Sequence, residues 1–280
     1  MRRPTPGTTS DGPTTGDGVA TGDGVAAPMS TEIQRIWPLP AGGPVDDNML
    51  TDWHLGATVA PGRAWVRMNF VSSIDGSAGR EGASGQLSGD ADKRVFEILR
   101  RVCDVVLVGA GTVRAEGYGP MRVSETSARW RAGNGRPEHP VFAIPSARAD
   151  LDPGSRIFTE APVRPIVFTV GSAPAERRRA LAEVAEVILC GDEVLDPAVM
   201  VSALTERGLP QVLCEGGPHL HGSMLAAGVL DEMFLTVSPV LEGGGGLGRI
   251  VAGEPAERGQ HMHLVSVLTS EGFLLLRYRR

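Results

Sequence analysis

Two glycine-rich bends could bring the backbone of this chain close to a phosphate group. One follows the apolar run 105–108 and contains Gly109 and Gly111; the other follows the run 211–214 and has the sequence EGGP at 215–218. Glycine places no side chain between backbone and ligand, and a helix that begins at such a bend offers free N–H groups. If the two strands are parallel and adjacent, both bends share one sheet edge, so the pair predicts a site for a phosphate-bearing ligand.

Neither bend has a familiar phosphate-binding motif. No Gly-Lys-Ser/Thr follows the first bend, and the only lysine of the chain, Lys93, precedes it. Arg114 stands where the third glycine of G-x-G-x-x-G would be. A tight turn from strand to helix without a ligand is therefore the alternative for either bend taken alone.

Two acids follow predicted strands. Glu215 could recognise donor groups on a heterocycle or a ribose, or could simply favour a helix N-terminus. Asp75 lies in the polar bend 72–76, and its alternative is a plain Asp-Gly turn. No metal is expected, because the H-x-H pairs at 219–221 and 261–263 have no cluster of cysteines or carboxylates beside them.

Composition restricts the class of protein. The 280 residues carry a net charge of −6 and show no basic face, so nucleic acid is not an expected partner. The three cysteines lack C-x-x-C spacing, and their sparse, odd number favours a reducing compartment. No apolar run reaches membrane-spanning length, and the N-terminus has no apolar core typical of a signal peptide. We therefore expect a cytoplasmic protein that does not bind membranes.

The chain divides into three parts. Residues 1–28 are rich in Gly, Thr, Asp and Pro and repeat the sequence TGDGVA, which predicts a disordered tail. Residues 29–62 are expected to be a lead-in segment, and Met29 is an alternative translation start. Residues 63–280 are expected to form one domain.

The third part alternates between strand and helix patterns, which predicts an α/β fold with a mixed, mostly parallel sheet flanked by helices. Strands are expected at 65–71, 105–108, 141–144, 165–170, 187–189 and 211–214, and helices at about 88–102, 173–183, 197–207 and 219–227. The last strands, 232–237, 263–269 and 272–278, have no helix between the final two and predict antiparallel pairing. A second glycine cluster occupies 243–246, and residues 122–140 are expected to form a polar loop.

Five motifs occur together in this part: MNFVSSIDG, ASGQLSGDADKRVFEILR, DVVLVGAGTVRAEGYGP, VLCEGGPHLHGSML and GVLDEMFLTVSPVLEGGGG. In this order and spacing they resemble the reductase domain of riboflavin biosynthesis, the RibD C-terminal-like family, in its stand-alone actinobacterial type. The resemblance implies a dihydrofolate-reductase-like three-layer fold, a homodimer and NADPH as cofactor. It also implies reduction of the ribosyl group of 5-amino-6-(5-phosphoribosylamino)uracil to a ribityl group, with hydride reaching C1′ of the open imine.

The resemblance also implies roles for residues by position. Asp75 matches the signature aspartate of the first loop, and Asp75 and Glu215 are the expected catalytic residues. Ser84, Arg100 and Glu215 match substrate positions, with Arg100 pairing the substrate phosphate and Arg122 as a second candidate contact. The expected cofactor contacts are Gly109, Gly111, Thr112, Glu116, Ser146, Gly216, Gly217, Pro218, His219 and Leu220.

Three features depart from the family pattern. The first sixty residues contain neither H-x-E nor P-C-x-x-C, so deaminase activity is not expected. Ser77 replaces the lysine of the usual S-L-D-G-K, and EGYGP at 116–120 replaces the usual Asp-Asp-Pro. These last two changes weaken the assignment of the substrate more than that of the cofactor. They leave open the reduction of another heterocycle such as dihydrofolate or a pterin, NADPH binding without catalysis, or purely structural glycine bends.

Overall fold

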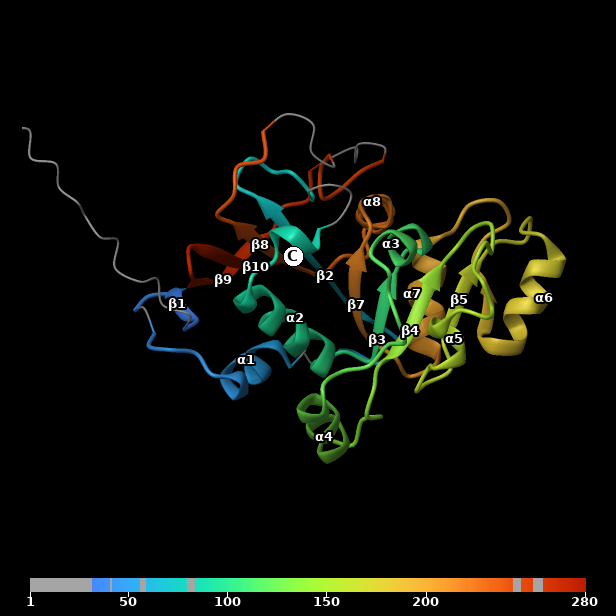
Figure 1. The fold of residues 1–280 in the computed structure, drawn as a ribbon, viewed down its shortest axis with the longest axis horizontal. Helices are drawn as coiled ribbons and strands as arrows, with labels where there is room; N and C mark the ends of the chain where they lie inside the picture. The colour runs from blue at the N-terminus through green and yellow to red at the C-terminus, as the bar shows by residue number, and fades with distance from the viewer. Residues whose placement is uncertain (1–31, 41, 56–58, 80–83, 244–247, 254–258) are drawn as a thin grey trace, which may run out of the picture.

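A ten-stranded mixed sheet lies between two layers of helices in the computed structural model of the chain, which describes residues 32–40, 42–55, 59–79, 84–243, 248–253 and 259–280 (Figure 1). The predicted α/β class and the dihydrofolate-reductase-like fold are confirmed. The expected tail 1–28, Met29 and most of the glycine cluster 243–246 lie outside the described residues. None of the described helices is both long and apolar enough to span a bilayer.

The strands are β1 (Gln34–Trp37), β2 (Trp65–Ser73), β3 (Val105–Val108), β4 (Val141–Pro145), β5 (Ile166–Thr169), β6 (Glu186–Leu189), β7 (Gln211–Gly216), β8 (Glu232–Ser238), β9 (His263–Ser270) and β10 (Phe273–Arg279). Their order across the sheet is β1-β9-β10-β8-β2-β7-β3-β4-β5-β6. The strands from β8 to β6 in this order run parallel, whereas β10, β9 and β1 pair antiparallel with their neighbours. The antiparallel C-terminal strands expected from the sequence are therefore confirmed.

The helices are α1 (Asp47–His54), α2 (Asp90–Val102), α3 (Ala110–Ala115), α4 (Glu125–Gly133), α5 (Arg156–Thr159), α6 (Ala175–Val184), α7 (Pro197–Glu206) and α8 (Pro218–Ala226). Side chains from α1, α2, α3, α5 and α6 form one core with one face of the sheet. Side chains from α7 and α8 form a second core with the other face. In Figure 1, α1 and α2 lie towards the β10-β9-β1 end of the sheet, and α5, α6 and α7 lie towards the β4-β5-β6 end.

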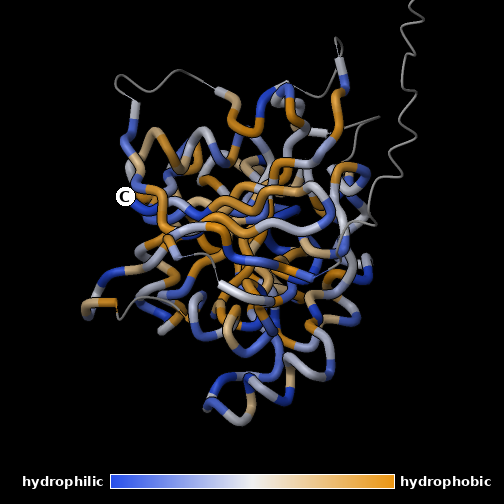
Figure 2. Tube along the Cα trace, turned by 90° about the vertical axis from the view of Figure 1, so that its left-hand side faces the viewer, coloured by the Kyte–Doolittle hydropathy of each residue, from blue (hydrophilic) through white to orange (hydrophobic). Residues whose placement is uncertain are grey.

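Strand β3 shows how an apolar run becomes a central strand. Its side chains alternate: Val106 and Val108 enter the first core, and Val105 and Leu107 enter the second. A parallel strand that is covered on both faces in this way needs an uninterrupted apolar sequence. Figure 2 shows the same distribution for the chain, with hydrophobic segments at the centre and hydrophilic segments at the outer bends.

The expectation of a polar loop at 122–140 is wrong, because α4 lies within it. Ser124 caps this helix by accepting a hydrogen bond from the amide of Ser127. The buried side of the helix includes an arginine: the guanidinium of Arg131 donates to backbone carbonyls at the end of α2. A buried arginine contributes nothing to an apolar periodicity, so the sequence pattern gives no helix signal here. The lead-in segment also contains β1 and α1, which the sequence did not predict.

The carboxyl ends of β2, β7 and β3 meet at one edge of the sheet. Because β3 and β7 are adjacent and parallel, the two glycine bends lie side by side. The amide of Gly109 donates to the carbonyl of Gly216 at 2.7 Å. The expectation that both bends share one sheet edge is confirmed.

Candidate active site

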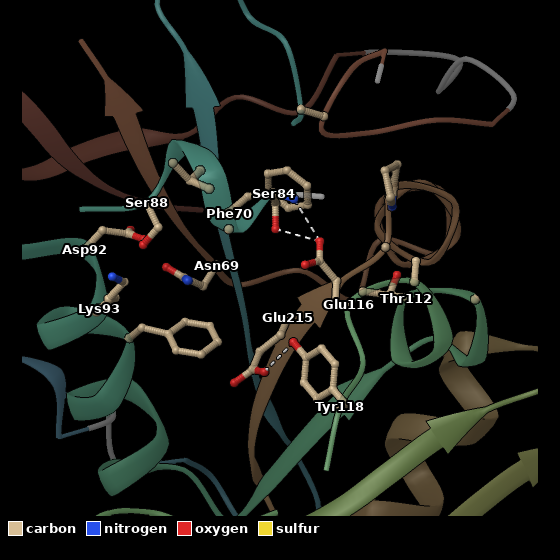
Figure 3. Close-up of a pocket in the computed structure, with 18 of the residues that line it drawn as sticks. Asn69, Phe70, Ser84, Ser88, Asp92, Lys93, Thr112, Glu116, Tyr118 and Glu215 are labelled. Carbon is tan, nitrogen blue, oxygen red and sulfur yellow. Dashed lines mark hydrogen bonds between the residues drawn. The ribbon is translucent and has the colours of Figure 1, made fainter. Parts of the chain in front are cut away.

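A cavity of about 510 Å³ lies at this edge of the sheet, between α2 and α3 (Figure 3). Strands β2 and β7 supply its floor, and the two helices with their adjoining turns supply its walls. The lining residues are Asn69, Phe70, Val71, Ala78, Ser84, Gly85, Ser88, Asp92, Lys93, Phe96, Arg100, Gly111, Thr112, Ala115, Glu116, Tyr118, Glu215, Gly217 and Pro218.

The floor of the cavity holds a buried ion pair. Arg100 of α2 donates to both carboxylate oxygens of Glu215, at the end of β7, with both distances 2.6 Å. Tyr118 donates to Oε2 of the same carboxylate at 3.1 Å, as Figure 3 shows. The side chain of Glu215 is 1% exposed and that of Arg100 is 18% exposed, so little water reaches the pair. Two parallel hydrogen bonds of this kind fix the orientation of both groups.

Burial and neighbouring charge shift the pKa values of Arg100 and Tyr118. Burial opposes the charge on Arg100, but Glu215 outweighs burial and raises the pKa of the guanidinium. Burial and then Glu215 raise the pKa of the Tyr118 hydroxyl well above its usual value, so Tyr118 keeps its proton. The ring of Phe96 lies 4.3 Å from Cζ of Arg100, where the aromatic face stabilises the cation. The arrangement can orient a planar polar ligand but supplies no ready acid.

A second contact joins two walls of the cavity. The amide and the hydroxyl of Ser84 both donate to Oε1 of Glu116 at 2.9 Å (Figure 3). On the α2 side, Ser88 donates to Asp92, and Lys93 lies next to them. The sequence assigned Ser84 to the substrate and Glu116 to the cofactor, whereas in the structure the two residues are hydrogen-bonded to each other.

A second cavity of about 400 Å³ adjoins the first at Gly111, which lines both. Asp150 is its central acid: the hydroxyl of Ser146 donates to it at 2.8 Å, and Arg114 and Arg148 each approach it at 3.6 Å. The lining residues are Gly109, Ala110, Gly111, Arg114, Pro145, Ser146, Ala147, Arg148, Asp150, Leu195, Pro197, Met200, His219, Leu220 and Ser223.

The glycine bends leave the room that a dinucleotide requires. No atom lies within 4 Å of the Cβ position of Gly111, whereas a Cβ on Gly217 would meet Oγ1 of Thr112 at 2.3 Å. Helices α3 and α8 begin after Gly109 and Gly217 without a side-chain cap, so no capping side chain takes up their first amides. Two adjoining cavities beside such amides fit an extended cofactor with phosphate groups at its centre.

Most of the residues predicted for the site come together in these cavities. The first cavity contains Ser84, Arg100, Gly111, Thr112, Glu116, Glu215, Gly217 and Pro218. The second contains Gly109, Gly111, Ser146, His219 and Leu220. Gly216, Asp75 and Arg122 line neither of the two. The carbonyl of Gly216 instead joins the two glycine bends.

Asp75 and Arg122 are engaged elsewhere. Asp75 is exposed and accepts hydrogen bonds from the hydroxyl of Ser73 and from the amide of Gly243, the latter at 2.8 Å. These bonds, that of Ser73 first, lower the pKa of Asp75 to about 2 and tie the bend after β2 to the segment after β8. Arg122 is exposed and donates to the carbonyl of Glu160 at 2.9 Å.

Several lining residues are absent from the sequence prediction: Asn69, Phe70, Lys93, Phe96 and Tyr118. Lys93 and Phe96 are spaced with Arg100 at i, i+3 and i+7, which places all three on one face of α2. That spacing is a usable signal once Arg100 has been assigned. Tyr118 gives no such signal, because its direction depends on the turn that follows α3.

The first histidine pair separates in the structure. His219 lines the second cavity, whereas His221 is buried with Nδ1 3.2 Å from the carbonyl of Ile250 and its ring against Phe70. Among the described residues, no group of three or more side chains could hold a metal ion.

Comparison with known proteins agrees with this geometry. The sequence matches the family model described as RibD C-terminal domain over residues 64–275. It is also similar to a protein of Methanothermobacter thermautotrophicus named 2,5-diamino-6-ribosylamino-4(3H)-pyrimidinone 5′-phosphate reductase. The two are 32% identical, over 69% of this chain and 85% of that protein.

Two solved structures resemble the chain. A pyrimidine reductase-like protein from Corynebacterium diphtheriae gives a TM-score of 0.71 with 25% identity, covering 82% of this chain and 98% of that one. A diaminohydroxyphosphoribosylaminopyrimidine deaminase/5-amino-6-(5-phosphoribosylamino)uracil reductase from Thermotoga maritima gives a TM-score of 0.59. At 23% identity over 78% of this chain and 56% of that one, it shows a shared fold.

Proposed function

The chain belongs to the RibD C-terminal domain family, and we propose that it is an NADPH-dependent reductase of riboflavin biosynthesis. In the proposed reaction the ribosyl group of 5-amino-6-(5-phosphoribosylamino)uracil becomes a ribityl group. Hydride adds to C1′ of the open imine and a proton adds to the adjacent nitrogen, so the C=N bond becomes a single bond. The observation that carries the proposal is one cavity in which the Arg100–Glu215 pair and the Thr112–Gly217 bend occur together.

We assign the floor of the cavity to recognition of the heterocycle. A pyrimidine ring presents N–H donors and carbonyl acceptors along its edge, and Glu215 and Asn69 offer matching atoms. The rings of Phe70 and Phe96 give the apolar surface on which a planar ligand packs. Tyr118 holds the carboxylate of Glu215 in place and excludes water from one side of it.

The phosphate of the substrate requires a cation besides Arg100. Glu215 accepts from the Nε–H and from one N–H of Nη2 of Arg100 and offsets its charge, which leaves both N–H groups of Nη1 and one of Nη2 for a ligand. Ser77 stands in place of the lysine expected in the first loop, is buried, and donates to the carbonyl of Gly79. Lys93 lines the cavity, is 67% exposed and lies 3.9 Å from Asp90. We assign the phosphate to Lys93 together with Nη1 of Arg100.

We assign the second cavity to the distal half of the cofactor. A nicotinamide cofactor, when bound, supplies the hydride. Pro218 at the start of α8 has no N–H, so the amides of Gly217, His219 and Leu220 would hold the phosphates of the cofactor. Arg114 and Arg148 favour NADPH over NADH, because guanidinium groups pair with a 2′-phosphate. Asp150 keeps both arginines near the cavity.

Asp75 receives a different role from the one that the sequence suggested. It is exposed and lies outside the cavity lining, and its carboxylate holds two loop segments together. We therefore propose that Asp75 orders the bend after β2 and does not touch the substrate.

We further propose that the protein is a homodimer. On one face of β8 and β10, the cross-strand pairs Leu274–Val237, Leu276–Leu235 and Tyr278–Met233 present apolar side chains that are half-buried or exposed. The opposite face of these strands is buried at its centre, at Phe234, Thr236, Leu275 and Arg277. An apolar sheet face of this kind favours contact with an identical face of a second copy.

A second candidate substrate is the diamino compound for which the Methanothermobacter relative is named. It differs from the uracil compound in carrying an amino group where the latter has a carbonyl. The carboxylate of Glu215 at the floor could accept a hydrogen bond from such an amino group.

The test is NADPH oxidation, followed by absorbance, with the purified chain and separate substrates. The parallel samples contain the uracil compound, the diamino compound, dihydrofolate, or no substrate. Oxidation with the uracil compound supports the main proposal, and oxidation with the diamino compound alone selects the second candidate. Oxidation with dihydrofolate alone, or NADPH binding without any oxidation, contradicts both.

A further inference from the structure

Three faces of helix α2 have different neighbours. Val95, Leu99 and other apolar residues face the sheet. Lys93, Phe96 and Arg100 face the cavity. The remaining face carries Arg94 and Arg101, two arginines seven positions apart and therefore on the same side of the helix. Neither arginine lines the cavity, so the partners of this third face have no place in the function proposed above.

Those partners come largely from the N-terminal brace, which we define as residues 32–40 and 42–55. The brace precedes the part of the chain that matches the family model, 64–275. Its strand β1 pairs antiparallel with β9, and Ile33, Val45 and Leu50 are buried in the first core. Its helix α1 is capped by Asp46, which accepts a hydrogen bond from the amide of Met49. The brace is thus built into the fold.

The brace contacts α2 at two positions along the helix. Near the start of α2, Arg94 donates to the carboxylate of Asp47 and to the carbonyl of Val45. Near its end, Nη1 of Arg101 donates to the hydroxyl of Thr51 at 2.9 Å. The second contact is enclosed, because Thr51 is 2% exposed and the side chain of Arg101 is 5% exposed.

Loss of the Thr51 hydroxyl would leave a buried guanidinium without one of its partners. A buried donor without an acceptor is strongly disfavoured, so the helix end would move to rehydrate Arg101. Arg101 directly follows Arg100, the residue that pairs with Glu215 at the cavity floor. Any movement at Arg101 therefore displaces the ligand-facing side of α2.

We propose that the N-terminal brace positions α2, and that Thr51 is a positioning residue for the substrate side of the cavity. The effect on the substrate rests on the proposed function, whereas the effect on α2 does not. The cofactor bends belong to β3, α3, β7 and α8, which the Thr51–Arg101 contact does not involve. Loss of the brace contact should therefore weaken binding of the pyrimidine and leave the affinity for NADPH unchanged.

The experiment compares four forms of the full chain: wild type, Thr51→Val, Thr51→Ser and Asp52→Ala. Valine keeps the shape of threonine and removes the hydroxyl, whereas serine keeps the hydroxyl. Asp52 is the control, because it is an exposed residue of the same helix. Hydrogen–deuterium exchange of residues 90–102 is measured for each form, with the KM for the pyrimidine and the Kd for NADPH.

Faster exchange in α2 and a KM raised by about tenfold are expected for Thr51→Val alone, since small displacements of positioning groups have effects of this order. Thr51→Ser and Asp52→Ala should match wild type, and NADPH affinity should be the same in all four. Unchanged exchange, an unchanged KM, or an equal loss of NADPH affinity in Thr51→Val would overturn the proposal. If wild type shows no turnover, the proposed function fails, and the exchange result alone still decides whether the brace holds α2.

Discussion

Arg100 and Glu215 are 115 positions apart in the sequence, yet their side chains form two hydrogen bonds of 2.6 Å at the floor of the cavity. The sequence assigned both residues to the substrate separately. The structure makes them one unit, in which the carboxylate restrains the guanidinium and Tyr118 restrains the carboxylate. Recognition of the pyrimidine then depends on the pair, and each partner alone is a buried group without its counter-charge.

Single substitutions in this pair should damage stability and activity together. Arg100→Met and Glu215→Gln each leave one buried partner uncompensated, so the free energy of unfolding should fall by about 3 kcal/mol. The value of kcat/KM should fall by about 100-fold, because the remaining partner no longer orients the substrate. Chemical denaturation and steady-state kinetics measure the two effects.

The double variant Arg100→Met with Glu215→Leu separates stability from recognition. Replacing both charges by apolar groups removes the uncompensated charge, so the unfolding free energy should return close to that of wild type. Activity should stay low. Full recovery of kcat/KM in the double variant would show that the pair has only a structural role.

The close approach between Gly217 and Thr112 predicts a cofactor defect. A Cβ at position 217 would lie 2.3 Å from Oγ1 of Thr112, so Gly217→Ala should displace the side chain of Thr112 or separate the two bends. The Kd for NADPH should rise by about tenfold or more, since backbone approach to phosphate is lost. Isothermal titration calorimetry measures this affinity. Gly119→Ala is the matched control, because no atom lies within 4 Å of its Cβ position, and equal effects in both variants would contradict the account.

Two buried histidines predict a loss of stability in mild acid. Burial, with help from Arg277, lowers the pKa of His54 from 6.5 to about 3, and burial lowers that of His221 to about 4. Below pH 6.5 the unfolded chain binds protons at these histidines that the folded chain excludes. The free energy of unfolding should therefore fall by about 1.4 kcal/mol per pH unit for each histidine as the pH drops towards 4.

Denaturant titrations between about pH 4 and about pH 8 measure that slope, because this range extends above and below the pH at which the histidines of the unfolded chain titrate. His54→Gln should reduce the slope by about 1.4 kcal/mol per pH unit and leave a smaller dependence from His221. A slope that stays the same in His54→Gln and in His221→Gln would assign the acid sensitivity to other groups.

The proposed dimer can be tested on its sheet face. Leu276 on β10 pairs across the strands with Leu235 on β8, at the centre of the apolar face. Leu276→Glu places a charge there and should convert a dimer into a monomer, as judged by analytical ultracentrifugation. Val194→Glu is the control, because Val194 is a hydrophobic residue 78% exposed outside this face. A monomeric wild type, or a Leu276→Glu variant that remains dimeric, would refute the proposed interface.

Local patterns in the sequence were sufficient for much of the fold. The apolar run of β3 and the spacing of Val95, Leu99 and Val102 in α2 report burial directly, because each repeats with the period of its element. The glycine bends follow such runs, so their shared edge could be expected from parallel strand order. Helix α4 was missed for the opposite reason, since Arg131 is on its buried side.

The contacts within the site are less accessible to sequence reasoning. Which carboxylate Arg100 meets is decided by the packing of α2 on β7, and no local pattern encodes it. Ser84 and Glu116 bond to each other although the sequence placed them on different ligands. Asp75 matched a family position, but the hydrogen bond that it accepts from the amide of Gly243 depends on a segment 168 positions further along the chain.

Hydride transfer to the sugar carbon of the substrate can be followed with a labelled cofactor. The enzyme would be supplied with the uracil compound and with NADPH that carries deuterium at both C4 positions of the nicotinamide, and the product would be examined by NMR. We expect deuterium at C1′ of the ribityl group in step with cofactor oxidation. Oxidation of NADPH without deuterium at C1′, or no reaction with the uracil compound or its diamino counterpart, would contradict it.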